Sequence, residues 1–265
     1  MGILSLPNEL LLLIADDLLV RDLSHLFSTC RRLASLLTPR FHKLALEDVG
    51  SLTALQWAAR NGHASLAELV LSEGTVGGVI SGKRREPHPT PLYLAANYNH
   101  PDVIRVLAKH GEQITGRIFG PSAPLHEAAS QRSAQAIRAL LELGADMTSK
   151  DTWGKTPAHI SAAKGDIDSM RAFIDAGLDF YYLQSGEGWT VLHQAVIYRK
   201  RAMVEFLLGN GGKKVINVKD ARGRTPLHRA YELSAGKEIV QLLCSSGANM
   251  EMTDSLGQTP LRLAR

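Results

Sequence analysis

The sequence predicts an all-helical protein in which a short three-helix module precedes a solenoid of stacked helix pairs. Three observations support this prediction: one short motif recurs along most of the chain, a glycine follows each copy at a nearly fixed distance, and the N-terminal segment is rich in leucine at helical spacing. A sequence period of about 20–50 residues is typical of solenoids, because each unit buries its apolar face only against its neighbours.

The recurring motif is Thr-Pro-Leu-His, which is complete at Thr225-Pro226-Leu227-His228. Its first positions are Thr53, Thr90, Ala123, Thr156, Thr190, Thr225 and Thr259, at intervals of 37, 33, 33, 34, 35 and 34 residues. A threonine hydroxyl can accept a backbone N–H in the first turn of a helix, and proline suits the next position because its missing N–H would be unpaired there. Each copy therefore predicts the start of a helix.

A glycine is expected to end the second helix of each unit. Gly74, Gly111, Gly144, Gly177 and Gly211 follow the aligned position by 21 residues, and Gly247 follows it by 22. From each glycine to the next aligned position the distance varies between 12 and 16 residues. Insertions therefore collect in the connecting loops, where extra length disturbs no packing.

This motif and its period resemble the ankyrin repeat. The resemblance covers residues 51–265, as about six repeats and a terminal half repeat. It implies helix pairs joined by β-hairpin loops, and a surface that binds another protein. The half repeat covers the sixth repeat only in part, so fraying is expected from Asp254 onward.

The N-terminal segment has a different pattern. Leu6-Pro7-Asn8-Glu9-Leu10 opens a helix, and the apolar run from Leu10 to Ile14 covers its whole circumference. Two further short helices are predicted, and Pro39 ends the last of them. A module of this size cannot bury so much leucine internally, so an apolar face is expected to contact something else.

Residues 1–46 resemble an F-box, in the form common in filamentous fungi, through Leu6-Pro7, the Asp22-Leu23 pair and the Cys30-Arg31 pair. One departure is that no Trp follows Cys30-Arg31, where many animal F-boxes have one. The resemblance implies a substrate-recognition subunit of a cullin-RING ubiquitin ligase that docks on a Skp-type adaptor, while other subunits transfer ubiquitin to an unknown protein target. The adaptor-binding residues that it implies are Leu6, Pro7, Leu10, Ile14, Leu18, Leu23, Leu26, Cys30 and Leu33.

Two other functions stay open. In an ankyrin scaffold without a ubiquitin-ligase role, the first helices would only cap the solenoid, although a cap should be polar on its outer face. An enzyme would need a site. No catalytic constellation of side chains stands apart from the repeat pattern. The four histidines of the motif recur with it and are therefore expected to form local hydrogen bonds: His126, His159, His193 and His228. The stretch 77–83 resembles a phosphate-binding loop but is followed by Arg84 in place of Ser or Thr, so no cofactor is expected.

Charged and aromatic residues suggest where a target would bind. The formal net charge of +4 argues against a nucleic-acid partner, and the basic residues form short clusters, among them Lys83-Arg84-Arg85 and Arg199-Lys200-Arg201. Such clusters are either solvated or face an acidic partner or an import receptor. Trp153 and Trp189 fall in or beside predicted hairpin tips, where aromatic residues are frequent contact points. The expected target-binding residues are Lys83, Arg84, Arg85, Trp153 and Trp189.

The sequence also bears on location. Only Cys30 and Cys244 are present, far apart and without metal-ligand spacing, which favours a reducing compartment. Neither a signal peptide nor an apolar run of about 20 residues is found, so no membrane contact is expected. These features predict a protein of the cytoplasm, the nucleus or both.

Overall fold

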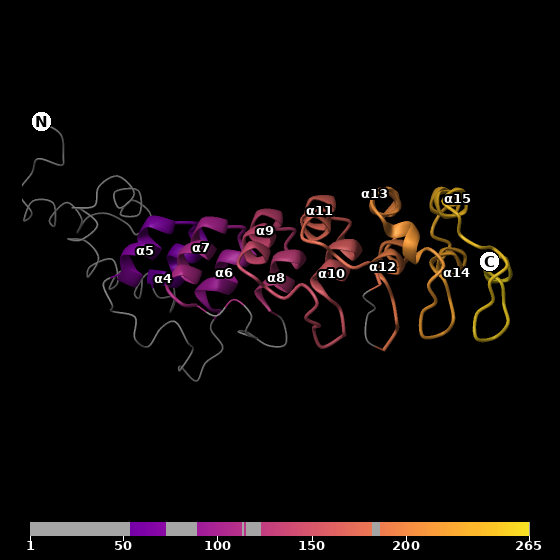
Figure 1. The fold of residues 1–265 in the computed structure, drawn as a ribbon, viewed down its shortest axis with the longest axis horizontal. Helices are drawn as coiled ribbons and strands as arrows, with labels where there is room; N and C mark the ends of the chain where they lie inside the picture. The colour runs from indigo at the N-terminus through magenta and orange to yellow at the C-terminus, as the bar shows by residue number, and fades with distance from the viewer. Residues whose placement is uncertain (1–53, 73–88, 113, 115–122, 182–185, 265) are drawn as a thin grey trace, which may run out of the picture. The chain divides into compact units, whose positions relative to one another are not determined.

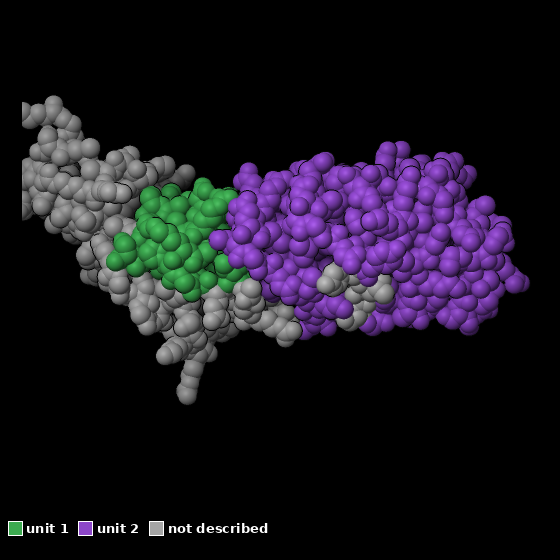
Figure 2. Space-filling model, in the orientation of Figure 1, with its two compact units in different colours: residues 1–120 green, residues 121–265 purple. Residues whose placement is uncertain are grey.

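The computed structural model describes residues 54–72, 89–112, 114, 123–181 and 186–264. The chain divides into two compact units, residues 1–120 and residues 121–265 (Figure 2). The residues predicted to bind an adaptor, and Lys83, Arg84 and Arg85, lie outside the described part. Throughout that part the secondary structure is helical, with no strand.

Each repeat contributes two antiparallel helices. In the first unit the described pairs are α4 (Ala54–Asn61) with α5 (Ala64–Ser72) and α6 (Pro91–Asn97) with α7 (Pro101–Lys109). The described pairs of the second unit are α8 (Pro124–Ser130) with α9 (Ala134–Glu142), α10 (Pro157–Lys164) with α11 (Ile167–Asp175), α12 (Val191–Ile197) with α13 (Arg201–Gly209), and α14 (Pro226–Glu232) with α15 (Lys237–Ser245). A 3-10 turn, η2 (Gly212–Val215), follows α13, and η3 (Pro260–Leu263) stands where the first helix of a seventh repeat would begin.

Stacking within the second unit follows the repeat order. The first helix α10 packs between α8 and α12, while the second helix α11 packs on α9, and α13 on α15. Figure 1 shows the first helices of this unit in one row, the second helices in another, and the loops projecting on the side of the first helices. Fully buried apolar residues such as Ile137, Leu140 and Phe173 lie between the rows. Burying each such side chain contributes about 1.5–3 kcal/mol.

The predicted start and stop positions are confirmed where the structure describes them. Thr90, Thr190 and Thr225 precede a helix, and each hydroxyl oxygen accepts the N–H of the residue three positions on. Gly144 follows α9 in the left-handed region, with φ of +86°, which glycine adopts without strain. The N–H groups of Gly144 and Ala145 donate to the carbonyls of Leu141 and Leu140, satisfying the end of the helix.

The loops between repeats are hairpins without strands. The N–H of Asp254 donates to the carbonyl of Gln258 at 2.9 Å, and equivalent bonds close the loops that begin at Asp151 and Asp220. The carboxylate Oδ1 of Asp254 also accepts the N–H groups of Leu256 and Gln258, both at 2.9 Å. Two backbone bonds within the tip and one aspartate side chain therefore hold each of these tips, which is too little pairing for a strand.

Candidate functional site

Buried histidines join one repeat to the next. In the fifth repeat, Nδ1 of His193 accepts the backbone N–H of Thr190 at 3.2 Å, and its Nε2 lies 3.1 Å from the carbonyl of Arg224 in the following repeat. Because an N–H can only donate and a carbonyl can only accept, Nδ1 is unprotonated and Nε2 carries the hydrogen. The imidazole is therefore a neutral brace between a helix start and the next hairpin.

The same brace recurs along the second unit. The ring Nε2 of His126, His159 and His228 lies 3.1, 2.8 and 3.1 Å from the carbonyls of Lys155, Trp189 and Gln258, respectively. This confirms the structural interpretation of the repeated histidines. In the first unit Gln56 occupies the equivalent position, and its side-chain amide donates to the carbonyl of Pro89 at 2.7 Å. Aligning Gln56 with the histidines in sequence would have revealed this substitution.

Burial changes the acid–base properties of these rings. Removal from water lowers the pKa of both His159 and His193 to about 4, although the carbonyl that each ring donates to acts in the opposite direction. Burial also lowers the pKa of His228. The rings of His159, His193 and His228 are thus uncharged at neutral pH, as a brace that donates from one nitrogen and accepts at the other requires.

Hairpin tips of the second unit are bonded to one another. The N–H of Ala221 donates to the carbonyl of Glu187 at 2.9 Å, and the N–H of Ser255 donates to the carbonyl of Arg222 at 3.0 Å. Close approach requires glycine beside each bond: a Cβ on Gly223, whose φ is +73°, would lie 2.8 Å from the Ser255 nitrogen. The tips from 186 to 257 therefore form a fixed row.

Large apolar side chains stand exposed at the tips. Trp153 is 69% exposed and Leu256 is 82% exposed, although both would gain free energy from burial. Trp153, Glu187, Arg222 and Leu256 occupy corresponding positions, each three residues before the threonine of the next motif, and together we name them the tip row. The sequence pointed to Trp153 but missed Leu256, which the same alignment would have identified.

Unlike Trp153, Trp189 has both its indole N–H and its ring in contact with residues of the same unit. Its indole Nε1 donates to Oδ2 of Asp220 at 3.3 Å, and the guanidinium of Arg229 lies 4.9 Å from the centre of its ring. The residue is half-buried. Its role as a target contact stays a prediction, and the structure supplies a packing role as well.

Asp220 is the centre of a buried ionic cluster around Trp189. Arg224 and Arg229 approach Oδ2 of Asp220 at 3.2 and 3.4 Å, and both arginines donate to Glu232 at 2.9 Å. Burial alone raises the pKa of Asp220, but backbone hydrogen bonds from Arg224 and Arg222, with the Arg224 charge, outweigh it and lower that pKa. Two negative and two positive groups balance, so the cluster holds Trp189 in place and carries no net charge.

A second aromatic–cation pair lies in the preceding repeats. The Nζ of Lys155, from the loop before α10, is 5.9 Å from the ring centre of Tyr198 at the end of α12, within the range of a cation–π contact. Tyr198 is 47% exposed. Both the tip row and the exposed ring of Tyr198 are accessible to a protein partner.

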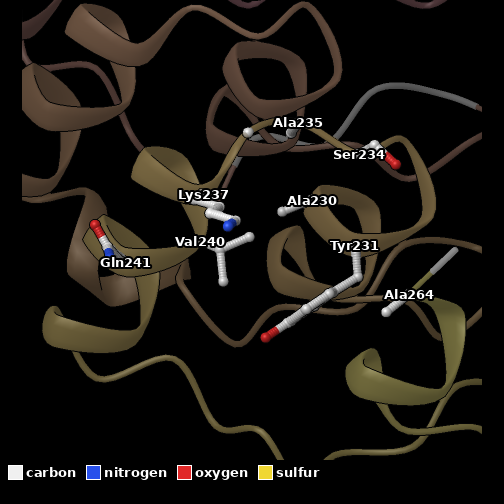
Figure 3. Close-up of a pocket in the computed structure, with 9 residues that line it drawn as sticks. Ala230, Tyr231, Ser234, Ala235, Lys237, Val240, Gln241 and Ala264 are labelled. Atoms are coloured by element: carbon white, nitrogen blue, oxygen red, sulfur yellow. The ribbon is translucent and has the colours of Figure 1, made fainter.

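The end of the sixth repeat carries a largely apolar hollow. A pocket of about 470 Å³ is lined by residues of α14 and α15 and by Ala264 after η3 (Figure 3). Figure 3 shows Tyr231 on α14 and Val240 on α15 on either side of this space. In the preceding repeats the corresponding surface is covered by the next helix pair, as α13 is by α15. The pocket thus lies on the stacking face of the sixth repeat.

Among the residues that the structure describes, no group of three or more His, Cys, Asp or Glu side chains is placed to hold a metal ion. None of the described helices combines the length and the apolar character that a membrane crossing would need.

Comparison with known proteins agrees with this architecture. The model of ankyrin repeats in three copies matches residues 25–118 and 125–217, and the single ankyrin-repeat model matches residues 222–255. The ankyrin repeat domain of Bcl-3, described as a member of the IkappaB protein family, is 25% identical with a TM-score of 0.70, covering 81% of this chain and 94% of that one. For the human ASB11 ankyrin repeat domain the values are 24%, 0.65, 81% and 92%.

A curated relative matches over a shorter stretch. Human diacylglycerol kinase iota is 30% identical over 84 residues, which are 31% of this chain and 8% of that protein. The chain therefore spans a small part of that relative's length. Both the family models and the stacked helix pairs lead to one conclusion: this chain belongs to the ankyrin-repeat family.

Proposed function

We propose that the second unit binds a protein partner through its tip row. The exposure of Trp153 and Leu256 carries this proposal, because two large apolar side chains are held in water at tips closed by their own backbone bonds, and the tips of Glu187, Arg222 and Leu256 are also bonded to one another. A preformed row loses little conformational entropy on binding. Arg222 and Glu187 between them would give the contact its polarity and orientation.

The tip row is tested by capture of partners from a lysate, followed by measurement of affinity for the purified partner. Trp153→Ala combined with Leu256→Ala should weaken binding at least about 30-fold, as expected when two apolar anchors are lost. Leu143→Ala is the control, since Leu143 is 36% exposed at the end of α9 and outside the row. Unchanged affinity in the double variant, or an equal loss in the control, would contradict the proposal.

A finer function is proposed for the chain as a whole: recognition of a protein target for a cullin-RING ubiquitin ligase in the cytoplasm or nucleus. It rests on the F-box resemblance of residues 1–46, which implies binding to a Skp-type adaptor through the face that includes Leu10 and Ile14. The ankyrin match starts at residue 25 and so overlaps Leu26, Cys30 and Leu33 of that segment. The alternative is an ankyrin scaffold whose first helices belong to the repeat array.

Co-purification of the full chain with a Skp-type adaptor separates these two functions. The ligase proposal expects a complex that is lost when Leu10→Asp and Ile14→Asp are combined. The matched control combines Ser24→Asp with Ser35→Asp, which adds the same charge in the same segment. A chain that never retains the adaptor, or a complex that survives the leucine and isoleucine changes, leaves the scaffold function.

A further inference from the structure

A row of cations crosses the turns between first and second helices in the second unit. It consists of Arg132, Lys164, Arg199, Lys200 and Arg201, and we name it the turn ridge. These turns lie at the C-terminal ends of the first helices, whereas the tip row precedes their N-terminal ends. The ridge is therefore a different surface from the one proposed above.

Contacts between successive turns make the ridge continuous. The guanidinium of Arg132 donates to the carbonyl of Lys164 at 3.0 Å, one repeat further on. The side chain of Lys200 lies against Gly165, where an added Cβ would be 3.0 Å from its Cδ. Arg199 in turn donates to the carbonyl of Leu233 in the sixth repeat. Each turn thus touches the next.

The positive charge of the ridge is not neutralised within the described part of the unit. None of the five side chains forms an ion pair with a described residue. Asp166 is the nearest acidic residue in sequence to Lys164, and its carboxylate is engaged with the N–H and hydroxyl of Ser169 at the start of α11. Like charges held together in this way repel, which an acidic partner would relieve.

The backbone is left-handed at the corresponding turn position of every repeat in the second unit. Arg132 and Arg199 have φ of +62° and +53°, in the left-handed region where the corresponding residue of the fourth repeat is Gly165. An arginine there costs about 1–2 kcal/mol relative to its ordinary conformation. The bond to the next repeat offsets part of this cost, while the charge stays at the surface. Ser234, at the corresponding position of the sixth repeat, has φ of +48°, so the left-handed conformation belongs to the turn and fixes the direction in which the two arginine side chains leave the backbone.

We propose that the turn ridge binds an acidic segment of a partner protein in the polyproline II conformation. Neighbouring packed helices lie about 8–10 Å apart, so the ridge presents cations at about that spacing in the third, fourth and fifth repeats. A polyproline II chain has three residues per turn and rises about 3.1 Å per residue, which places every third side chain on one face about 9 Å apart. The segment therefore carries Asp or Glu at every third position.

Fluorescence anisotropy with the full chain tests this proposal. The probe is a labelled peptide of four Glu-Pro-Ala units, and its isomer has the same composition with the four glutamates adjacent. The variant Lys164→Glu with Arg201→Glu should weaken the first peptide about tenfold or more, and added salt should weaken it further. The control variant Lys213→Glu with Lys214→Glu makes the same charge change in η2, outside the ridge, and should change affinity less than about twofold.

Three results would overturn the proposal. Equal binding of the two isomers would remove the spacing argument, and an equal loss in the control variant would reduce the effect to net charge. Tighter binding of duplex DNA or of anionic lipid vesicles than of the peptide, with the same sensitivity to Lys164→Glu and Arg201→Glu, would assign the ridge to phosphate. Circular dichroism of every variant verifies that the helices are intact.

Discussion

The two units solve the same joining problem with different chemistry. In the second unit a histidine links each helix start to the next hairpin, and burial lowers the pKa of His159 and His193 to about 4. In the first unit Gln56 makes the equivalent bond with an amide that does not titrate. That unit instead buries Glu112, whose pKa burial raises to about 7. The two units share one fold, but acid should destabilise the second unit and alkali should destabilise the first.

Removing a histidine brace should have the largest effect. His193→Ala leaves the Thr190 N–H and the Arg224 carbonyl buried without their shared partner and opens a cavity, so the free energy of unfolding should fall by about 3 kcal/mol. Urea denaturation at pH 7.5 measures this loss. The matched change in the first unit, Gln56→Ala, should cost about 1 kcal/mol. An equal loss in the free energy of unfolding for both variants would contradict the difference between the two units.

Acid should destabilise the second unit. Because the folded pKa of His159 and His193 lies below the ordinary 6.5, the unfolded chain takes up protons first. The contribution of the two neutral rings to the free energy of unfolding is complete above pH 6.5 and is lost as the pH falls toward 4. The loss is at most on the order of 3 kcal/mol for each histidine. His159→Gln combined with His193→Gln should flatten stability between pH 6.5 and 4. An unchanged slope would show that other groups cause it.

Alkali should act on the first unit through Glu112. Its Oε2 has no hydrogen-bond partner among the described residues, and its side chain is buried. Since the folded pKa is raised from 4.5 to about 7, stability is full below pH 4.5 and is lost as the pH rises through 7. Glu112→Gln should therefore gain about 2 kcal/mol at pH 8 and little at pH 5. A gain that is the same at both pH values would contradict this reading.

The smallest effect concerns a missing cap. Ala123 stands where the neighbouring repeats have threonine, and it makes no side-chain cap at the start of α8. Ala123→Thr should stabilise the second unit by about 1 kcal/mol, because a hydroxyl there can accept the N–H of His126. Thermal denaturation measures the gain. Thr225→Ala is the reverse control and should cost a similar amount, since its hydroxyl accepts the N–H of His228.

Much of the fold followed from local chemistry in the sequence. Thr-Pro pairs predict helix starts and glycines predict helix ends because capping depends on a few adjacent atoms, so Pro226 and Gly144 lie where they were expected. Hydrogen bonding by the motif histidines was expected from the sequence. The carbonyls that accept from their Nε2 atoms were not, because those carbonyls belong to the next repeat. Glu112 carried a signal that the alignment holds: the corresponding residues Ala145, Leu178 and Ala248 are apolar, and Leu178 is buried.

The surface was harder to predict. The cluster of Asp220, Arg224, Arg229 and Glu232 around Trp189 joins groups from a loop and a helix, and no helical spacing shows that the loop carboxylate reaches both arginines. The turn ridge needs the stacking of repeats, since Arg132 and Lys164 are neighbours only in the folded chain. Exposure at Leu256 likewise depends on the tip geometry rather than on residue type.

The protonation state of His193 tests the central claim most directly. Nitrogen-15 NMR of imidazole-labelled protein, with His193→Gln used to assign the resonance, reports the tautomer and the pKa. The brace requires a neutral ring with hydrogen on Nε2 at pH 6 and a pKa near 4. A ring protonated on Nδ1, or one that titrates at its ordinary 6.5, would contradict it.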